Sequence, residues 1–244
     1  MKRPSKLYIY GRHAVAEALR HTPRAVRTVY LGSPGDDLVR SLAQKANIAV
    51  ERLDERKVTS MVEGKASHQG VVALISHTDL VIPAERFIEN LKVTDETLVV
   101  FLSEITDPHN VGAIIRSAAA LGASAVILPT HKQSPITPAV IKVSAGMAFQ
   151  IPLVAAENPQ QAIAQLKKKG MKVYGLAADG STSLKDESFT GPSMIVVGNE
   201  GEGIAPYARA LCDTMLSIDL EPTAESLNVA ASAAIALYAW RRTR

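Results

Sequence analysis

Three segments of the sequence contain polar side chains that could take part in a reaction, set among residues that shape the backbone, such as glycine and proline. The first spans residues 104–117 and contains Asn110, Gly112 and Arg116. A guanidinium group beside the start of a helix favours a phosphate, because both attract negative charge. Asn110 and Arg116 lie about 120° apart around a helix, so Arg116 must lean toward the helix start to act beside Asn110. The alternative is a capping Asn110 and a solvated Arg116.

The second segment is a glycine-rich loop, residues 198–203, with the sequence GNEGEG. Its glycines would let a ligand approach the backbone closely. The spacing matches neither the dinucleotide-binding G-x-G-x-x-G pattern nor a P-loop. Two carboxylates, Glu200 and Glu202, would repel a pyrophosphate, so the loop better suits a ligand with cationic or hydroxyl groups. The alternative is a flexible turn with solvated acids.

The third segment spans residues 218–229 and leads into an apolar stretch. Ser226 is predicted to be the N-cap of the helix that follows. Asn228 falls in the first turn of that helix, and a buried amide needs hydrogen-bond partners. Asn228 is therefore predicted to face a site. The alanine-rich residues 230–236 would let another backbone come close, which indicates an interior helix, a dimer interface or both.

These segments are set in a chain whose second part alternates strand-length apolar runs with helical patterns. Strands are expected at 98–102, 125–128, 151–154, 173–177, 194–197 and 215–218, and helices at 110–121, 138–145, 160–169 and 227–241. Short connections between alternating strands and helices predict an open, mostly parallel sheet covered on both faces. Ligands of such sheets bind beyond the carboxyl ends of the strands, where all three polar segments lie.

The first part of the chain reads as a smaller α/β module. Strands are expected at 26–31, 48–50 and 70–75, and helices at 14–19 and 37–46. A connector with a helix at 83–91 follows. The predicted domains are therefore an N-terminal domain over 1–78, a linker over 79–96 and a second domain over 97–244.

The composition bounds the class of protein. Of the 244 residues, 47% are hydrophobic and only 5% aromatic, which suits helices packed closely on a parallel sheet. Cys212 is the single cysteine, so neither a disulfide framework nor a cysteine-based zinc site is possible. The longest apolar run, 227–240, is shorter than the roughly 20 residues of a membrane span. The N-terminus is basic and lacks the apolar segment of a signal peptide. We therefore predict a cytoplasmic protein with no membrane contact.

The charge is unevenly distributed along the chain. Residues 1–80 hold 13 Lys and Arg against 8 Asp and Glu, whereas the whole chain carries only +3. This asymmetry indicates that the first module touches a polyanion, with an ordinary solvated surface as the alternative. His13, His68 and His109 lack the paired spacing of metal ligands, so no metal site is predicted.

Taken together, the three segments resemble a known family. The patterns N-x-G-x-x-x-R over 110–116, G-N-E-G-x-G over 198–203 and S-L-N-V over 226–229, in this order, are similar to those of the SpoU/TrmH (SPOUT) RNA 2′-O-ribose methyltransferases. The sequence YGRHAV at 10–15 and HQG at 68–70 resemble the N-terminal domain of the bacterial 23S rRNA guanosine 2′-O-methyltransferase branch. The resemblance covers nearly the whole chain.

The resemblance implies a fold and an activity. It implies an L30e-like N-terminal RNA-binding domain, followed by an α/β-knot domain whose C-terminal segment threads a trefoil. It also implies a homodimer that methylates RNA, with 23S rRNA as partner and S-adenosyl-L-methionine as cofactor. The implied catalytic residues are Asn110, Arg116, Glu200, Ser226 and Asn228. The implied cofactor-binding residues are Gly198, Gly203, Ile218, Leu220 and Leu227.

The sequence departs from the family pattern beside the third segment. Asp219 stands where the family often has proline, and Pro222 follows within the same loop. These changes leave the catalytic set intact but bear on cofactor contacts and substrate choice. Two other functions stay open: a tRNA 2′-O-methyltransferase of the same family, and a non-catalytic RNA-binding paralogue. An ordinary Rossmann nucleotide enzyme is disfavoured, because its glycine spacing is missing.

Overall fold

The structure is a computed structural model that describes residues 6–33, 35–54, 56 and 68–244. The chain forms two compact units. Unit 1 comprises Met1–Val81 with Ile136–Gln150, and unit 2 comprises Ile82–Pro135 with Ile151–Arg244. The predicted second domain thus contributes the segment 136–150 to unit 1.

Unit 1 is built on a four-stranded sheet in the order β1-β4-β2-β3. Its strands are β1 (Lys6–Tyr10), β2 (Val26–Leu31), β3 (Ala49–Arg52) and β4 (Val71–Ser76). β4 runs antiparallel to both of its neighbours, whereas β2 and β3 are parallel. The alternating sequence of β1, KLYIY, buries Leu7 and Ile9 and was not predicted as a strand.

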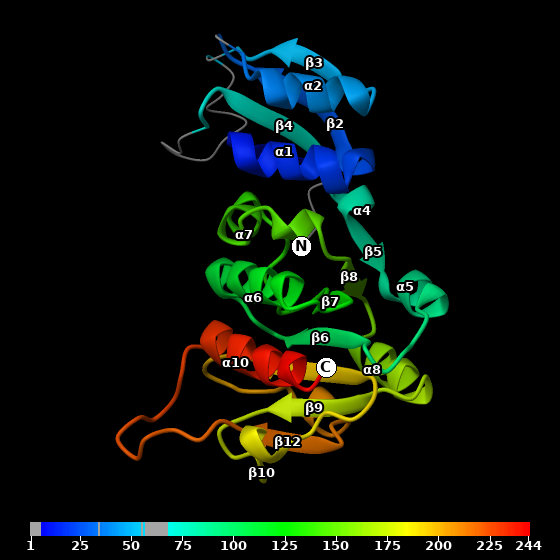
Figure 1. Cartoon of the computed structure of the whole chain (residues 1–244), viewed down its shortest axis with the longest axis vertical. Coiled ribbons are helices and arrows are strands. Elements are labelled where there is room, and N and C mark those ends of the chain that lie inside the picture. The colour runs from blue at the N-terminus through cyan, green and yellow to red at the C-terminus, as the bar shows by residue number, and fades with distance from the viewer. Residues whose placement is uncertain (1–5, 34, 55, 57–67) are drawn as a thin grey trace. The chain divides into compact units, whose positions relative to one another are not determined.

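Two helices, α1 (Arg12–His21) and α2 (Asp37–Lys45), pack against each other and against this sheet (Figure 1). Their apolar positions recur at helical spacing, and α1 buries Val15, Ala18 and Leu19 while α2 buries Val39 and Ala43. Asp36 caps α2 by accepting a hydrogen bond from the amide of Val39. The short helix α4 (His77–Leu80) and strand β5 (Val81–Pro83) follow β4.

The segment 136–150 joins unit 1 through polar contacts to α1. It contains α7 (Pro138–Val143) and the 3-10 turn η2 (Met147–Phe149). Gln150 donates a 2.6 Å hydrogen bond to the buried carboxylate of Glu17. Gly146 approaches Glu17 so closely that a Cβ there would lie 3.0 Å from the Glu17 side chain. A local pattern of helix and turn residues cannot reveal this partner, which explains why the sequence did not place the segment here.

Unit 2 is built on an eight-stranded sheet in the order β10-β12-β9-β11-β6-β7-β8-β5. The strands beyond β5 are β6 (Leu98–Ser103), β7 (Ala125–Pro129), β8 (Leu153–Ala156), β9 (Lys172–Leu176), β10 (Thr182–Ser183), β11 (Ser193–Gly198) and β12 (Thr214–Ser217). Every pairing whose register is defined in the described part of this sheet is parallel. The predicted α/β class with a mostly parallel sheet is confirmed.

Helices cover both faces of this sheet. The helices of unit 2 are α5 (Ala84–Asn90), α6 (Pro108–Ala120), α8 (Pro159–Lys168), α9 (Pro206–Arg209) and α10 (Val229–Arg242). One face shares a core with α5, α8 and α9, in which Phe101 and Val196 are fully buried. On the other face α10 packs beside α6 and against β11 (Figure 1). Residues 98–102 of β6 and 194–197 of β11 are all apolar and buried. Because successive strand residues point to opposite faces, both faces of these strands are apolar.

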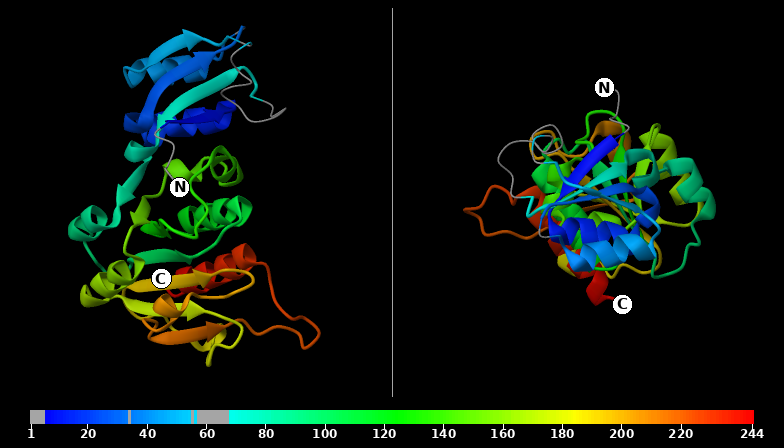
Figure 2. Two further views of the ribbon diagram at one scale, coloured as in Figure 1. Left: turned by 180° about the vertical axis from the view of Figure 1, so that it is seen from behind. Right: turned by 90° about the horizontal axis from the view of Figure 1, so that it is seen from above.

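The segment between β12 and α10 stands out from the body of unit 2. It projects as an extended loop in every view of the structure (Figures 1 and 2). All of its residues from Glu221 to Asn228 are exposed. The helix after it starts at Val229, two residues later than the predicted start, which moves Ser226 and Leu227 out of the helix and into this loop.

Candidate active site

Two loops of unit 2 leave the sheet side by side. β6 and β11 are parallel neighbours, and their last residues, Ser103 and Gly198, are paired in register. The loops 104–107 and 199–203 therefore start at the same edge, at the carboxyl ends of the strands. The amide of Ala205 donates a 3.0 Å hydrogen bond to Oγ of Ser103, which ties the far end of the second loop back to the first.

The loop after β6 delivers Asn110 into the first turn of α6. Asp107 caps the helix by accepting a hydrogen bond from the amide of His109 (2.8 Å), and Pro108 occupies the first helical position. The alternative role of Asn110 as the cap is therefore wrong, and its side chain is released for other partners. The Asp-Pro pair at 107–108 is a helix-start signal that could have been found in the sequence.

Three polar side chains from three loops or helix starts are joined by hydrogen bonds. Asn110 donates from Nδ2 to Oε1 of Glu200, which lies in the glycine-rich loop. Asn228 donates from Nδ2 to Oδ1 of Asn110 at 3.0 Å. The amide of Asn110 is thus engaged at both ends, which fixes its orientation between the carboxylate and the second amide. The structure thus brings together the side chains of Asn110, Glu200 and Asn228.

Asn228, rather than Ser226, is the N-cap of α10. Its Oδ1 accepts hydrogen bonds from the amides of Ala230 (2.9 Å) and Ala231 (3.3 Å). The prediction that Ser226 caps this helix is therefore wrong, because an asparagine two residues later satisfies the free amides instead. Ser226 lies exposed in the preceding loop, and within the part of the chain that is described its side chain makes no hydrogen bond.

Arg116 stands apart from this hydrogen-bonded group. It lies on α6, six residues after Asn110, and its side chain is exposed. Among the residues with described positions it has no hydrogen-bond or ion-pair partner. The structure therefore offers a guanidinium with unused donors on the same helix as Asn110, but no direct contact between the two.

The glycines of the second loop allow the main chain to fold back closely on itself. A Cβ on Gly198 would lie 2.4 Å from the carbonyl carbon of Gly203 and 2.5 Å from the amide of Ile204. The main chains of Asn199 and Gly203 exchange two hydrogen bonds, of 2.8 and 3.0 Å. Gly203 also adopts a positive φ of 71°, a conformation that glycine takes without strain. The loop is thus a tight, hydrogen-bonded turn. The close approach of the main chain of Gly203 to Gly198 within it forms a backbone crossing.

The segment after β12 makes few main-chain hydrogen bonds to the described part of the chain. Between Ile218 and Leu227, which are all described, the one backbone–backbone hydrogen bond runs from the amide of Ala224 to the carbonyl of Glu221 (2.9 Å). Among the described residues, the amides and carbonyls of Ile218 and Leu220 have no hydrogen-bond partner, and their apolar side chains are half-buried. Leu227 is 39% exposed.

Asp219, the departure from the family pattern, is held in place by its own partners. Its carboxylate accepts a 2.9 Å hydrogen bond from Ser183 and pairs with Lys185 at 2.6 Å. The hydrogen bonds from Lys185 and Ser183 hold the pKa of Asp219 below its usual value. The aspartate therefore anchors this segment to the end of β10, where a proline could only restrict the backbone.

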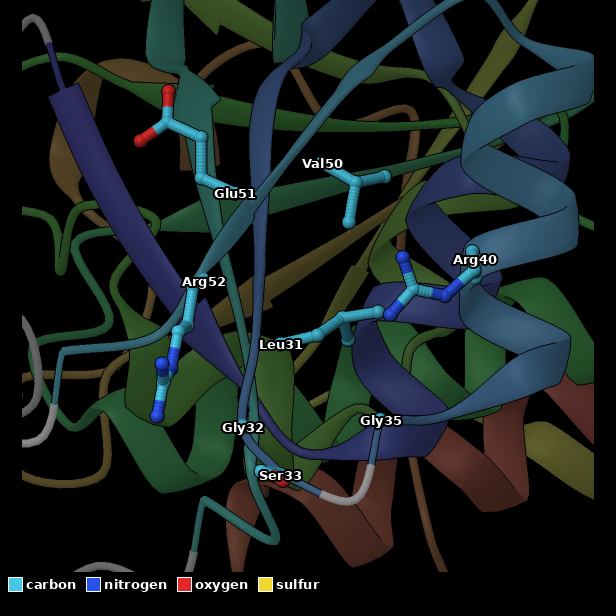
Figure 3. Close-up of a pocket in the computed structure, with 8 residues that line it drawn as sticks. All are labelled: Leu31, Gly32, Ser33, Gly35, Arg40, Val50, Glu51 and Arg52. Carbon is cyan, nitrogen blue, oxygen red and sulfur yellow. The ribbon is translucent and has the colours of Figure 1, made fainter.

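Three other features bear on the kind of function: metal ligands, membrane-spanning helices and pockets. No group of three or more His, Cys, Asp or Glu side chains that could hold a metal ion occurs among the described residues. Nor is any helix within those ranges long and apolar enough to span a bilayer. Unit 1 contains an open pocket of about 440 Å³ beside the ends of β2 and β3, into which Arg40 reaches from α2 toward Leu31 (Figure 3).

The fold and the site together define an α/β protein that gathers polar groups beyond the carboxyl ends of parallel strands. The sequence pattern of the SpoU rRNA methylase family matches residues 97–238. A second pattern, described as RNA 2′-O ribose methyltransferase substrate binding, matches residues 8–79. The chain belongs to the SpoU rRNA methylase family, as the three sequence segments indicated.

Curated relatives match the chain over almost its full length. It is similar to the 23S rRNA (guanosine-2′-O-)-methyltransferase RlmB of Pseudomonas syringae pv. tomato, with 36% identity over 97% of this chain and 95% of the relative. The protein of the same name from Neisseria meningitidis serogroup B is 35% identical over 97% of this chain and 95% of its own.

Solved structures share the fold. The SpoU methyltransferase AviRb from Streptomyces viridochromogenes, in complex with the cofactor AdoMet, has a TM-score of 0.84 and 26% identity, covering 98% of this chain and 90% of its own. The TrmH/SpoU tRNA modifying enzyme of A. aeolicus has a TM-score of 0.54 and 26% identity, covering only 66% of this chain and 82% of its own.

Proposed function

We propose that this chain transfers a methyl group from S-adenosyl-L-methionine to the 2′-hydroxyl of a guanosine ribose in 23S rRNA. The observation that carries this proposal is the hydrogen-bonded group of Asn110, Glu200 and Asn228, built from the three segments that resemble the family. Family membership and full-length similarity to 23S rRNA methyltransferases support the reaction and the substrate class.

The cofactor would be held by the backbone of the glycine-rich loop and of the segment after β12. We assign Gly198, Gly203, Ile218, Leu220 and Leu227 to this role. The free backbone groups at Ile218 and Leu220 suit the polar edge of an adenine, and the half-buried apolar side chains suit its face. When bound, S-adenosyl-L-methionine supplies a methyl group on a positively charged sulfur. The carboxylate of Glu200, in the glycine-rich loop, would favour that positive charge.

The three hydrogen-bonded residues would orient the ribose. Oε1 of Glu200 accepts the hydrogen bond from Asn110, which leaves Oε2 to accept one from a substrate hydroxyl. Asn228 keeps the Asn110 amide from rotating, because it occupies Oδ1 while Glu200 occupies Nδ2. A hydroxyl held in this way can be aligned for in-line attack before the reaction starts, which is where most of the gain from proximity arises.

Arg116 would act by stabilising negative charge and not by accepting a proton. An arginine stays protonated in proteins, so it cannot serve as the base. Its five donors have no partner among the described groups, and a guanidinium matches the geometry of a phosphate. We assign Arg116 to binding a substrate phosphate and to stabilising the negative charge that develops on the 2′-oxygen as its proton leaves to solvent. Ser226, exposed beside Leu227, would add a hydroxyl contact to the substrate or the cofactor.

The rest of the chain would bring RNA to this site. We propose that residues 1–78 form the substrate-binding domain, that 79–96 are a linker and that 97–244 form the catalytic domain with the family's trefoil knot. The net charge of +5 over residues 1–80 favours a polyanion. We also propose a cytoplasmic homodimer that buries the exposed Ile235 (41%) and Tyr238 (61%) of α10.

Arg116→Ala tests the proposed function. Methyl transfer from labelled cofactor to a 23S rRNA fragment should fall by at least about a hundredfold, because an electrostatic contact to the developing charge is lost. Cofactor affinity, measured by calorimetry, should stay nearly unchanged. The control is Arg209→Ala, since the side-chain hydrogen bond and ion pair that the described residues give Arg209 are with Asp179 at the surface (2.7 Å). Full turnover by the Arg116 variant would end the assignment.

The same assay separates the alternatives. A tRNA methyltransferase would label total tRNA in preference to 23S rRNA fragments, and a non-catalytic paralogue would label neither. The comparison favours rRNA, because the solved tRNA modifying enzyme covers 66% of this chain whereas the 23S rRNA methyltransferases cover 97%. Mapping ribose methylation in RNA from cells that lack this protein would identify the nucleotide.

A further inference from the structure

Asn199 uses both ends of its side-chain amide to join two loops. Its Nδ2 donates a 2.9 Å hydrogen bond to the carbonyl of Glu104, in the loop after β6. Its Oδ1 accepts hydrogen bonds from the amides of Gly201 (2.9 Å) and Glu202 (3.3 Å), in the loop after β11. These are the two loops that place Asn110 and Glu200, so one amide connects the supports of both side chains.

The partner of Asn199 in the first loop is itself firmly held. Glu104 has a φ of 61°, a left-handed conformation that is rare outside glycine and asparagine. The next residue, Ile105, is buried and has both main-chain groups engaged: Gln133 accepts from its amide (2.9 Å) and Ser134 donates to its carbonyl (2.9 Å). The Glu104 carbonyl is therefore a fixed acceptor.

We propose that Asn199 is a positioning residue for methyl transfer, which holds Glu200 at the distance and angle at which it meets Asn110. This inference rests on the function proposed above. Asn199 acts through Glu200 rather than on the substrate, because its Oδ1 and one N–H of its Nδ2 are engaged within the two loops that carry Asn110 and Glu200. Supporting groups of this kind decide whether a functional side chain is held in its productive geometry.

The structure separates this role from cofactor binding. Gly203 is held by two main-chain hydrogen bonds to Asn199, of 2.8 and 3.0 Å, and these do not use the Asn199 side chain. Gly201 and Glu202, beside Glu200, depend on the side chain instead. Removal of the side chain should therefore loosen Glu200 while the crossing of Gly198 and Gly203 stays in place. The loss should appear in kcat and not in the affinity for the cofactor.

Two variants test the two ends of the amide. Asn199→Ala removes donor and acceptor, and kcat should fall at least about tenfold, because small misplacements of an orienting group are costly. Asn199→Asp keeps the acceptor for Gly201 and Glu202 but places a carboxylate oxygen, in place of the donor, against the carbonyl of Glu104, so its kcat should also fall. The Kd for S-adenosyl-L-methionine should change by less than about threefold in both, since the main-chain crossing is retained.

Amide hydrogen exchange gives a readout without cofactor or activity. In Asn199→Ala, exchange at Gly201 and Glu202 should accelerate, whereas exchange at Gly203 should stay as in the native chain. In Asn199→Asp all three amides should remain protected. Exchange reports local opening, so it distinguishes a loosened loop from general destabilisation, which would expose the three amides together.

A double-mutant cycle with Glu200→Ala tests whether Asn199 works through that residue. If it does, adding Asn199→Ala to the Glu200 variant should lower kcat by less than about twofold further, because the group it positions is already absent. Multiplying effects would overturn the proposal, as would an Asn199→Ala enzyme with native kcat or one whose loss lies in cofactor affinity. If the alanine variant does not fold, the aspartate variant takes its place in this cycle.

Asn90→Ala is the matched control, since Asn90 also donates its amide to a main-chain carbonyl, that of Arg86 (2.7 Å), but on the exposed surface of α5. It should leave kcat, the Kd for the cofactor and the three exchange rates unchanged. Failure of the proposed function would look different from failure of this inference. In the first case the native chain would transfer no methyl group to RNA, whereas in the second the native chain would be active and Asn199→Ala equally so.

Discussion

Asn228 donates a 3.0 Å hydrogen bond to Asn110, although 118 positions separate the two residues in the chain. The other end of the same amide caps α10. Because Nδ2 serves the site and Oδ1 serves the helix, catalysis and stability should depend on different atoms of one side chain. This division makes the two contributions separable by substitution.

Asn228→Asp should keep the cap and lose the donor to Asn110. The N-cap should be retained, since Asp and Asn are equally good N-caps, while kcat falls because a carboxylate oxygen would face Oδ1 of Asn110 in place of the donor. Asn228→Ala should lose about 1 kcal/mol of stability as well. Urea denaturation and methyl-transfer kinetics on the same preparations would measure both effects.

The control for the cap is Asn158→Ala. Asn158 caps α8 by accepting from the amide of Gln161 at 3.0 Å, and among the described residues its side chain makes no hydrogen bond to Asn110, Glu200 or Asn228. It should lose a similar amount of stability and keep native kcat. An Asn228→Asp enzyme with native kcat would show that the hydrogen bond to Asn110 has no catalytic role.

The backbone crossing at Gly198 leads to a second prediction. A Cβ at this position would come within 2.4 Å of the main chain of Gly203, and backbone atoms cannot move aside as the end of a side chain can. Gly198→Ala should therefore destabilise the protein by about 1–3 kcal/mol and weaken binding of S-adenosyl-L-methionine by at least about tenfold.

Gly201→Ala is the matched comparison within the same loop. The nearest atom to its added Cβ is Oδ1 of Asn199, at an ordinary contact distance of 3.6 Å. Cofactor affinity from calorimetry and the midpoint of thermal unfolding should both stay close to the native values. If the two glycine variants bound the cofactor equally well, the crossing would have no part in cofactor binding.

The sequence was sufficient to predict the parallel sheet but not the way its helices begin. Runs such as 98–102 and 194–197 are apolar at every position, because both faces of those strands are covered, and such runs are typical of parallel sheets. The start of a helix depends on which of several possible N-cap residues accepts the hydrogen bonds of the first free amides. Ser226 and Asn228 are both good N-cap residues. What distinguishes Asn228, the observed N-cap, is its hydrogen bond to Asn110, a residue distant in the sequence.

The candidate site was predicted in part for a similar reason. Residues that carry chemistry appear in sequence motifs, so Asn110, Glu200 and Asn228 could be named in advance and are now seen together. Residues that support them through main-chain contacts leave no such pattern. Asn199 lies inside a motif but its partner is the carbonyl of Glu104, a group that every residue possesses, so nothing in the sequence marks the contact.

Glu17 leads to a third prediction, which concerns pH. Burial acts to raise the pKa of Glu17, but hydrogen bonds from Arg20 and Gln150 and the charges of His21 and Arg20 outweigh it, so the pKa lies below its ordinary value of 4.5. A lowered pKa means that the carboxylate stabilises the folded chain above about pH 4.5, and that this contribution is lost as the pH falls through the folded pKa.

The Glu17→Gln variant should therefore be less stable than the native chain by about 1–3 kcal/mol at pH 7, and the difference should shrink as the pH falls below about 4.5. Urea denaturation followed by circular dichroism over pH 3–7 would measure it. Glu89→Gln, at an exposed position on α5, should show no such dependence. A difference that stays constant down to pH 3 would contradict the assigned charge interactions.

Cys212 gives a fourth prediction, and the chain is convenient for it because this is the single cysteine. Burial, with a smaller contribution from the neighbouring Asp213, raises the pKa of the thiol from 9.0 to about 11. The thiol also donates a hydrogen bond to the carbonyl of Ala208 at 3.3 Å. The thiolate is the reactive form, so at pH 8 its population in the folded chain should be about a hundredfold lower than in the unfolded chain.

Alkylation of Cys212 by iodoacetamide at pH 8 should accordingly be about a hundred times slower in buffer than in denaturing urea, once the reagent's own response to urea is corrected with a free thiol. Cys212→Ser should abolish the labelling and confirm the site. Because Asp213 contributes to the raised pKa, Asp213→Asn should accelerate labelling of the folded chain, although it also leaves a single side-chain acceptor for Lys167 and Val173. Following the rate against pH separates the two effects, since a lower pKa moves the rise in rate to lower pH, whereas local opening raises the rate at every pH. Equal rates for folded and unfolded native chain would show that the thiol is neither buried nor suppressed.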